Sequence, residues 1–164
     1  MINLFRFGGL LATLFLCSSA YAGDIQIQNA WARATAPGQD AASVDLTITS
    51  KHAAVLAGVS SPVAGAAALH SMAMEGGMMR MREVASIELP PGKTVNLGAS
   101  GYHLMLMGLK APLKEGQTVP LTLKIRVSKL GTMKLKTQAK VISLTASAPV
   151  QGNSGNQQMN MQMR

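Results

Sequence analysis

Alternation of apolar and polar residues is the feature that most constrains the fold of this chain. It runs through residues 119–127 and 133–141, and a shorter example covers residues 44–48. Because successive side chains of a strand point to opposite faces, a period of two predicts strands with one buried and one solvated face. Further strands are predicted at residues 25–33, 54–60, 66–72 and 78–87, and no segment has the pattern of an amphipathic helix.

Turn-forming residues separate these segments. The clearest are Ala36-Pro37-Gly38, Gly76-Gly77 and Pro90-Pro91-Gly92. Short strands at intervals of roughly 8–12 residues predict an all-β domain, either a sandwich or a barrel. Residues 23–145 are expected to form this domain as a single unit, because their number lies within the range of one domain.

The two ends of the chain differ from this pattern. Residues 1–22 are typical of a secretory signal peptide, with an apolar run too short to span a membrane and a small-residue cleavage site ending at Ala22. Cys17 raises a lipoprotein alternative, although the bulky Leu16 before it argues against lipoprotein processing. Residues 146–164 are polar and low in complexity, which predicts a disordered tail.

Composition excludes several classes of function. The only cysteine is Cys17, so the exported chain is expected to lack disulfides, thiol catalysis, zinc fingers, iron–sulfur clusters and thiolate-bound copper. The net charge is +8, but the basic residues are dispersed along predicted strands and aromatic residues are few, which disfavours binding to nucleic acid. The alternatives for these charges are an ordinary solvated face or a surface that steers an acidic protein partner.

Histidine and methionine concentrate in two short segments. Residues 69–82 read L-H-S-M-A-M-E-G-G-M-M-R-M-R, and residues 101–110 read G-Y-H-L-M-L-M-G-L-K. Thioether sulfur is a soft, neutral ligand and imidazole is borderline, so this combination favours Cu(I). Zinc prefers thiolate or carboxylate beside imidazole, and calcium and magnesium prefer oxygen.

Strand geometry relates some of these side chains. His103, Met105 and Met107 would share one face of a strand, and Met79 and Met81 would share a face of another. Neighbouring residues on one face have Cα atoms about 6.5–7 Å apart, so His103 and Met105 could converge on one metal ion. A single methionine more often fills a core, and packing stays the alternative for each residue taken alone.

The spacing of four residues adds a family resemblance. Ten residues separate His70 from Met81, twenty-one separate Met81 from His103, and one separates His103 from Met105. This H-x10-M-x21-H-x-M pattern resembles that of the PCuAC family of periplasmic copper chaperones. The flanking text at residues 101–110 and the segment A-W-A-R-A-T-A-P-G near the start are also similar to the family. The resemblance covers about residues 25–127.

The resemblance implies a fold, a site and a role. The implied fold is a cupredoxin-like Greek-key β-sandwich, and the implied Cu(I) ligands are His70, Met81, His103 and Met105. The implied role is delivery of copper in the periplasm to respiratory oxidases, notably the CuA centre of cytochrome c oxidase. The implied partners are the oxidase copper-binding subunit and Sco-type thioredoxin-like proteins. Because imidazole must be unprotonated to bind a metal, affinity is expected to fall in acid.

Several residues lie outside the simple match. Asp45 stands where the family usually has an aromatic or apolar residue, and it is expected to be remote from the ligand motif. Met159, Met161 and Met163 in the tail form either an auxiliary copper-capturing arm or part of an inert terminus. Five further residues of the same types are expected to pack, shield the site or capture a second ion: His52, Met72, Met74, Met78 and Met107.

Three other classes of function compete with a copper chaperone. An enzyme is not expected, because the chain lacks a G-x-S-x-G motif and has only seven acidic residues. A metal-free structural β-sandwich would use its methionines only for packing. A periplasmic buffer for copper or silver tolerance would use the same metal site as a chaperone, so the sequence does not separate these two.

Overall fold

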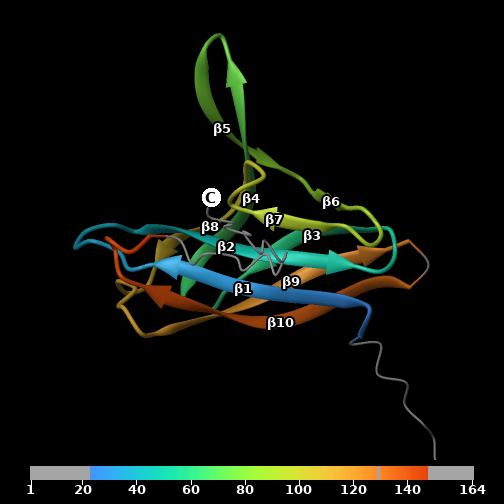
Figure 1. The fold of residues 1–164 in the computed structure, drawn as a ribbon. Coiled ribbons are helices and arrows are strands. Elements are labelled where there is room, and N and C mark those ends of the chain that lie inside the picture. Colours follow the sequence, from blue (N-terminus) through green and yellow to red (C-terminus); the bar gives the residue numbers. More distant parts are fainter. Residues whose placement is uncertain (1–22, 129, 148–164) are drawn as a thin grey trace, which may run out of the picture.

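The chain forms β-strands almost throughout the computed structural model, which describes residues 23–128 and 130–147 (Figure 1). Within these residues no α-helix is present, and no helix is long and apolar enough to cross a membrane. The predicted signal segment and residues 148–164 of the predicted tail lie outside the described residues. The strands are β1 (Ile25–Arg33), β2 (Ala41–Ser50), β3 (Ala54–Ser60), β4 (Ala64–Glu75), β5 (Met78–Val84), β6 (Ile87–Leu89), β7 (Thr94–Leu97), β8 (Tyr102–Leu109), β9 (Thr118–Val127) and β10 (Gly131–Ile142).

The strands pair in the order β5-β4-β8-β2-β1-β10-β9-β3-β6, and β7 pairs with β2 beyond the end of β8. All these pairs are antiparallel except β1 with β10. The single sheet folds over itself into two layers (Figure 1). The fold is therefore an all-β sandwich, as the alternating pattern predicted, and it agrees with the cupredoxin-like fold that the family resemblance implied.

Alternate residues of the central strands fill the space between the layers. On β8, Leu104 and Leu106 are completely buried, whereas His103, Met105 and Met107 on the other face are half-buried. Burying a side chain such as leucine contributes about 1.5–3 kcal/mol. The core therefore holds β8 in one register, and this register sends the histidine and both methionines to the outer surface. The largest fully buried residues are Val44, Leu46, Ile48, Leu56, Ile87, Leu89, Leu97, Leu104, Leu106, Leu121, Leu123 and Ile125.

The predicted strands correspond to observed ones with one error. The segments at residues 25–33 and 54–60 have the bounds of β1 and β3, and four others lie within longer strands. The single strand predicted at residues 78–87 is wrong. Strand β5 pairs with β4, whereas β6, the next strand along the chain, pairs with β3. Residues 85–86 therefore connect two different edges of the sheet. Strand β7 was not predicted, because its four residues are too few to show a period.

The β4–β5 hairpin projects from the sandwich (Figure 1). Strand β8 pairs with residues 64–71 of β4, whereas β5 pairs with residues 69–75, so the end of β4 has only β5 beside it. Gly76 and Gly77 close the hairpin with φ angles of 58° and 79°. Two consecutive positive φ angles are the geometry of a tight two-residue turn, which glycine adopts without strain.

Candidate metal centre

The two histidines of the predicted ligand set face each other across neighbouring strands. His70 on β4 is the direct partner of His103 on β8. Directly opposite residues have Cβ atoms about 4.5–5.5 Å apart and project to the same face. Their strand neighbours Leu69 and Leu104 are buried in the core, so both imidazoles belong to the outer face of the sheet. The pairing thus joins two histidines that are far apart in sequence.

The two methionines of the set lie diagonally on either side of His70. Met105 follows His103 on the same face of β8 and is opposite Ala68 of β4. Met81 on β5 is opposite Met72 and lies two residues from Glu83, the direct partner of His70 on that strand. Diagonal neighbours in a sheet are about 7–8 Å apart at Cα, within reach of long side chains. The structure therefore brings the four predicted residues to one face around His70.

His70 has an unusual environment for a histidine. Both of its ring nitrogens, Nδ1 and Nε2, are buried, and neither has a hydrogen-bond partner among the described residues. Leaving a buried polar group unsatisfied costs about 1–3 kcal/mol. A soft metal ion bound to the imidazole would remove part of this cost. The donor set of two imidazoles and two thioethers fits such an ion.

His103 has a carboxylate partner that the sequence interpretation placed elsewhere. Asp45 Oδ1 on β2 lies 3.3 Å from His103 Nδ1, and the two side chains are 20% and 19% exposed. The expectation that Asp45 is remote from the ligand motif is wrong, because the pairing of β2 with β8 brings the two residues together. A carboxylate that accepts a hydrogen bond from Nδ1–H fixes the tautomer and leaves Nε2 free to bind a metal.

The Asp45 carboxylate is held by its neighbours. The Ser43 hydroxyl donates a hydrogen bond to Asp45 Oδ1 at 3.4 Å. Gly98, which has a φ angle of +121°, lies against the carboxylate, and a Cβ atom there would be 2.8 Å from Asp45 Cγ. Any residue larger than glycine at position 98 would therefore displace the carboxylate from its place beside His103.

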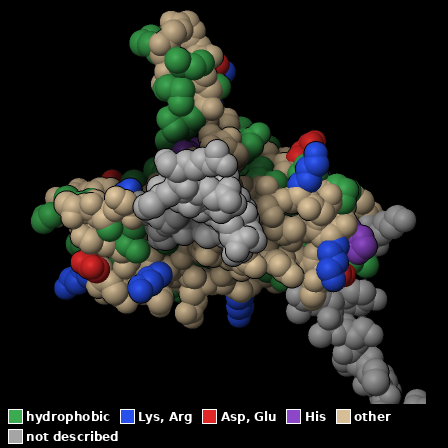
Figure 2. Space-filling view, in the orientation of Figure 1, with side chains coloured by type: hydrophobic (Ala, Val, Ile, Leu, Met, Phe, Trp, Pro, Cys, Tyr) green, Lys and Arg blue, Asp and Glu red, His purple; other side chains and the backbone are tan. Residues whose placement is uncertain are grey.

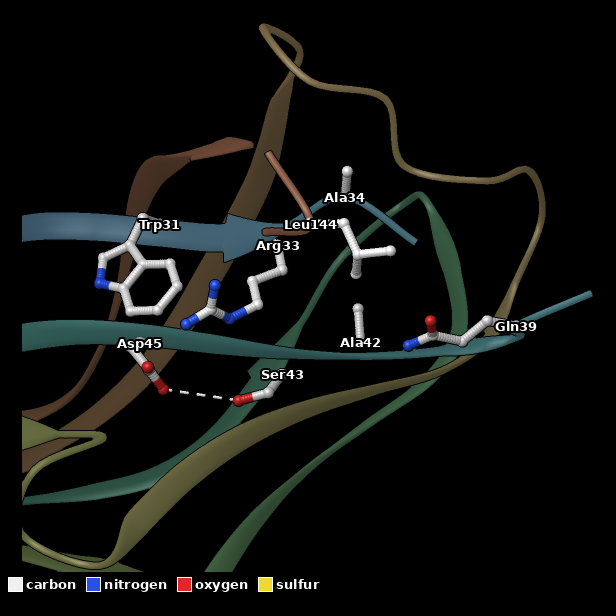
Figure 3. A pocket seen from close by; sticks show the side chains of 8 residues that line it. All are labelled: Trp31, Arg33, Ala34, Gln39, Ala42, Ser43, Asp45 and Leu144. Carbon is white, nitrogen blue, oxygen red and sulfur yellow. Dashed lines mark hydrogen bonds between the residues drawn. The ribbon is translucent and has the colours of Figure 1, made fainter. Parts of the chain in front are cut away.

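A pocket adjoins Asp45 on the side of β1 (Figure 3). It has a volume of about 190 Å³ and contains Trp31 and Arg33, whose guanidinium lies 5.4 Å from the centre of the indole ring. Figure 3 shows the arginine head group beside the indole, on the side of the pocket that faces Asp45 and Ser43. None of the four predicted ligands lines this pocket. The candidate metal centre is therefore separate from it and lies on the sheet surface.

The remaining histidine and methionines are distributed differently. His52, in the β2–β3 loop, lies 3.8 Å from Asp24 and is not part of the cluster. Met72, Met74, Met79 and Met107 are on the same outer face as the four predicted ligands, and Met78 is on the opposite face of the hairpin. Met133 on β10 packs against the core. In the part of the chain that the structure describes, no group of three or more His, Cys, Asp or Glu could hold a metal ion.

Comparison with known proteins identifies the family. The model of the family described as "LpqE-like: Putative lipoprotein LpqE-like" matches residues 25–141, which is most of the chain. The chain belongs to the LpqE-like family. A relative from Leifsonia xyli subsp. xyli (strain CTCB07), described as "Putative lipoprotein Lxx21020", is 38% identical over 104 residues. That match spans 63% of this chain and 63% of the relative's length.

Solved structures share the fold. The apo PCuAC domain from PmoF1 matches with a TM-score of 0.60 at 24% identity, covering 74% of this chain and 95% of that domain. The solution structure of CuI-DR1885 from Deinococcus radiodurans matches with a TM-score of 0.51 at 31% identity, covering 77% and 85%. These matches confirm the resemblance to PCuAC proteins that the ligand spacing indicated.

Proposed function

We propose that this protein binds one Cu(I) ion and carries it to other copper proteins. The observation that supports this most strongly is His70, whose two ring nitrogens are buried without a partner in the described structure. The imidazole of His103 is directly opposite, and two thioethers share the same face. A structural β-sandwich that used its methionines only for packing would gain nothing from such an unsatisfied imidazole.

The proposed ligands are His70, Met81, His103 and Met105, with Asp45 orienting His103. All four ligands are neutral, so the bound site keeps the single positive charge of Cu(I). Neutral ligands bind copper more weakly than thiolates, which favours transfer to an acceptor that contains cysteine. Four protein ligands leave no coordination position for a substrate, and the proposal is therefore a carrier rather than an enzyme.

One solved structure supports the choice of metal. The Deinococcus structure that shares 31% identity and this fold is that of CuI-DR1885. The copper-bound PCuAC domain from PmoF2 has the same fold at a TM-score of 0.58, and at 23% identity it supports the fold alone. The copper(I) assignment for this chain rests on the donor set and on the more similar Deinococcus structure.

The proposed destination is the copper centres of respiratory oxidases, in particular CuA of cytochrome c oxidase. The proposed partners are the copper-binding oxidase subunit and a Sco-type thioredoxin-like protein, and the proposed location is the periplasm. A strain that lacks the protein should lose oxidase activity at limiting copper. Increased copper sensitivity with normal oxidase activity would instead support the competing role of a copper or silver buffer.

The form in which the protein is exported is a separate proposal. Cleavage after Ala22 would release a chain without cysteine, whereas processing before Cys17 would leave a lipid-modified cysteine at the new terminus. The lipoprotein descriptions of the family and of the Leifsonia relative support the second form. The intact mass of the protein from native cells distinguishes the two forms.

The tail carries a further proposed role. Met159, Met161 and Met163 would act as an auxiliary arm that captures copper, and they lie outside the described residues. A chain that ends before Met159 should keep the tight site and lose one weaker equivalent of Cu(I). Unchanged stoichiometry would indicate an inert terminus.

An anaerobic titration tests the proposed function. The exported chain is titrated with Cu(I) against a chromogenic Cu(I) chelator, beside the His103→Ala variant and a matched His52→Ala control. We expect one tight equivalent in the wild type and in the control, and its loss in His103→Ala. Failure of the wild-type protein to compete with the chelator would contradict the copper-carrier proposal.

A further inference from the structure

The two faces of the projecting β4–β5 hairpin carry different chemistry. One face bears Glu75, Arg80 and Arg82, and the Glu75 carboxylate lies 2.6 Å from Arg82 Nη2 and 3.9 Å from Arg80 Nε. The other face bears methionines in two directly opposite pairs, Met72 with Met81 and Met74 with Met79. This second face continues the outer face of the sheet that carries His70.

The outer methionine pair is exposed to solvent. Met74 is 69% exposed and Met79 is 59% exposed. The alternative in which these methionines fill a core therefore does not apply to this pair. Figure 2 shows hydrophobic side chains along one side of the projecting hairpin, with a histidine visible at its base. Exposed apolar side chains gathered on one surface generally indicate an interaction with a ligand or partner.

We propose that Met74 and Met79 form a second Cu(I) site, which takes up the ion and passes it to the inner site. The inner site is the proposed site formed by His70, Met81, His103 and Met105. This inference rests on the proposed function of the inner site. Cβ atoms of directly opposite residues are about 4.5–5.5 Å apart, so both thioethers of the pair can reach one soft ion. Two thioethers leave positions at the ion for a ligand from a donor.

The spacing along the hairpin gives a path inward. The Met72–Met81 pair follows the outer pair on the same face at about 6.5–7 Å, and His70 follows Met72 at the same interval. Each step exchanges one thioether for the next while the copper stays Cu(I), so the transfer needs no electron or proton. The outer pair offers two thioethers and the inner site offers two thioethers and two imidazoles, which makes inward transfer favourable. Met81 belongs to both the path and the inner site.

Methionine methyl NMR tests this inference on the full exported chain. The protein carries ¹³C-labelled methionine methyl groups, and the tail residues Met159, Met161 and Met163 are replaced by leucine in every sample. Ag(I) serves as a redox-inert probe and Cu(I) is added anaerobically in a second series. We expect the first equivalent to shift the Met81 and Met105 methyl signals, and the second to shift those of Met74 and Met79.

Leucine variants separate thioether chemistry from apolar contact. The double variant Met74→Leu, Met79→Leu keeps the apolar surface, so it should lose the second equivalent and load the inner site more slowly from a Cu(I)–chelator complex. The matched control is Met78→Leu, since Met78 is 60% exposed but lies on the opposite face. The control should behave as the parent protein.

The outcomes distinguish the two proposals. If the first equivalent binds, but Met74 and Met79 do not respond to a second and the double variant loads as the control does, the outer site is overturned and the proposed function stands. A double variant that loads normally but fails to accept copper only from a protein donor would also overturn it, in favour of an apolar docking face. Absence of the first equivalent would contradict the proposed function itself.

Discussion

The candidate site joins two regions of the molecule that are held in place differently. His70, His103 and Met105 lie on β4 and β8 over the core, and the His103 side chain is only 19% exposed. Met81 lies at the base of the projecting hairpin and is 46% exposed. The first three residues are fixed by buried neighbours on the same strands, whereas Met81 depends on a two-stranded arm.

This difference suggests how a carrier can both hold and release an ion. Imidazoles that are fixed by buried neighbours on the same strands need little reorganisation when they bind a metal, so they contribute most to affinity. A methionine on an exposed arm has fewer contacts that resist its movement, so it is the ligand that can leave first. We call His70, His103 and Met105 over the core the wall, and the projecting β4–β5 hairpin with Met81 the hairpin arm. This division between wall and arm can be tested.

The largest effect is expected in the core beneath the wall. Leu104 is fully buried between His103 and Met105 on β8. Leu104→Ala should lower the free energy of unfolding by about 2–5 kcal/mol, through lost burial and a cavity. Denaturant unfolding of the copper-free protein measures this change. Met74→Ala, on the arm, is the control and should change stability by about 0.5 kcal/mol or less. Equal losses in both variants would contradict the division.

Removing a wall ligand should cost more affinity than removing the arm ligand. We expect His103→Ala to weaken Cu(I) binding by more than about 100-fold. Replacing a residue that only hydrogen-bonds to a metal ligand already lowers metal affinity by about 10–100-fold. Met81→Leu should weaken it less and should speed release to a chelator. Competition titration and stopped-flow release measure the two quantities. A larger loss of affinity for Met81→Leu than for His103→Ala would reverse the assignment of wall and arm.

Asp45 should act through His103 without contacting the metal. Asp45→Leu is expected to weaken Cu(I) binding by about 10–100-fold. Asp45→Asn keeps an oxygen that can accept from Nδ1–H, so it should restore most of the affinity. Nitrogen-15 NMR of the copper-free protein should show His103 protonated at Nδ1 in the wild type and a mixture of tautomers in Asp45→Leu. The same tautomer in both proteins would contradict the positioning role.

The smallest effect is expected on the charged face of the arm. Arg82 pairs with Glu75 in an exposed ion pair. Arg82→Gln should change the free energy of unfolding by about 1 kcal/mol or less, since exposed pairs contribute little. It should leave Cu(I) affinity unchanged, because the methionines lie on the other face. Thermal unfolding and the chelator competition check both expectations, and a clear loss of affinity would mean that the two faces are coupled.

Local patterns predicted the strands of the core because burial alternates along them. Strand β9 alternates buried and exposed residues along most of its length, as the period of two requires. The strand predicted across residues 78–87 failed, since its break depends on where the chain changes partners between β4 and β3. Apolar character alone does not contain that information.

The candidate site was likewise predicted only in part from the sequence. The ligand set came from spacing and a family resemblance, and the structure places its members on one face. The contact of Asp45 with His103 spans 58 positions and depends on how β2 pairs with β8. The absence of a Cβ at Gly98 matters only because Asp45 lies there. Such contacts arise from tertiary register, which a single sequence does not show.

X-ray absorption spectroscopy of the protein loaded with one equivalent of Cu(I) tests whether two imidazoles and two thioethers bind the ion. The sample is the Met74→Leu, Met79→Leu variant with the tail methionines replaced by leucine, so that only the proposed inner site is measured. We expect two nitrogen ligands with imidazole scattering and two sulfur ligands. A copper environment without sulfur, or with sulfur alone, would contradict it.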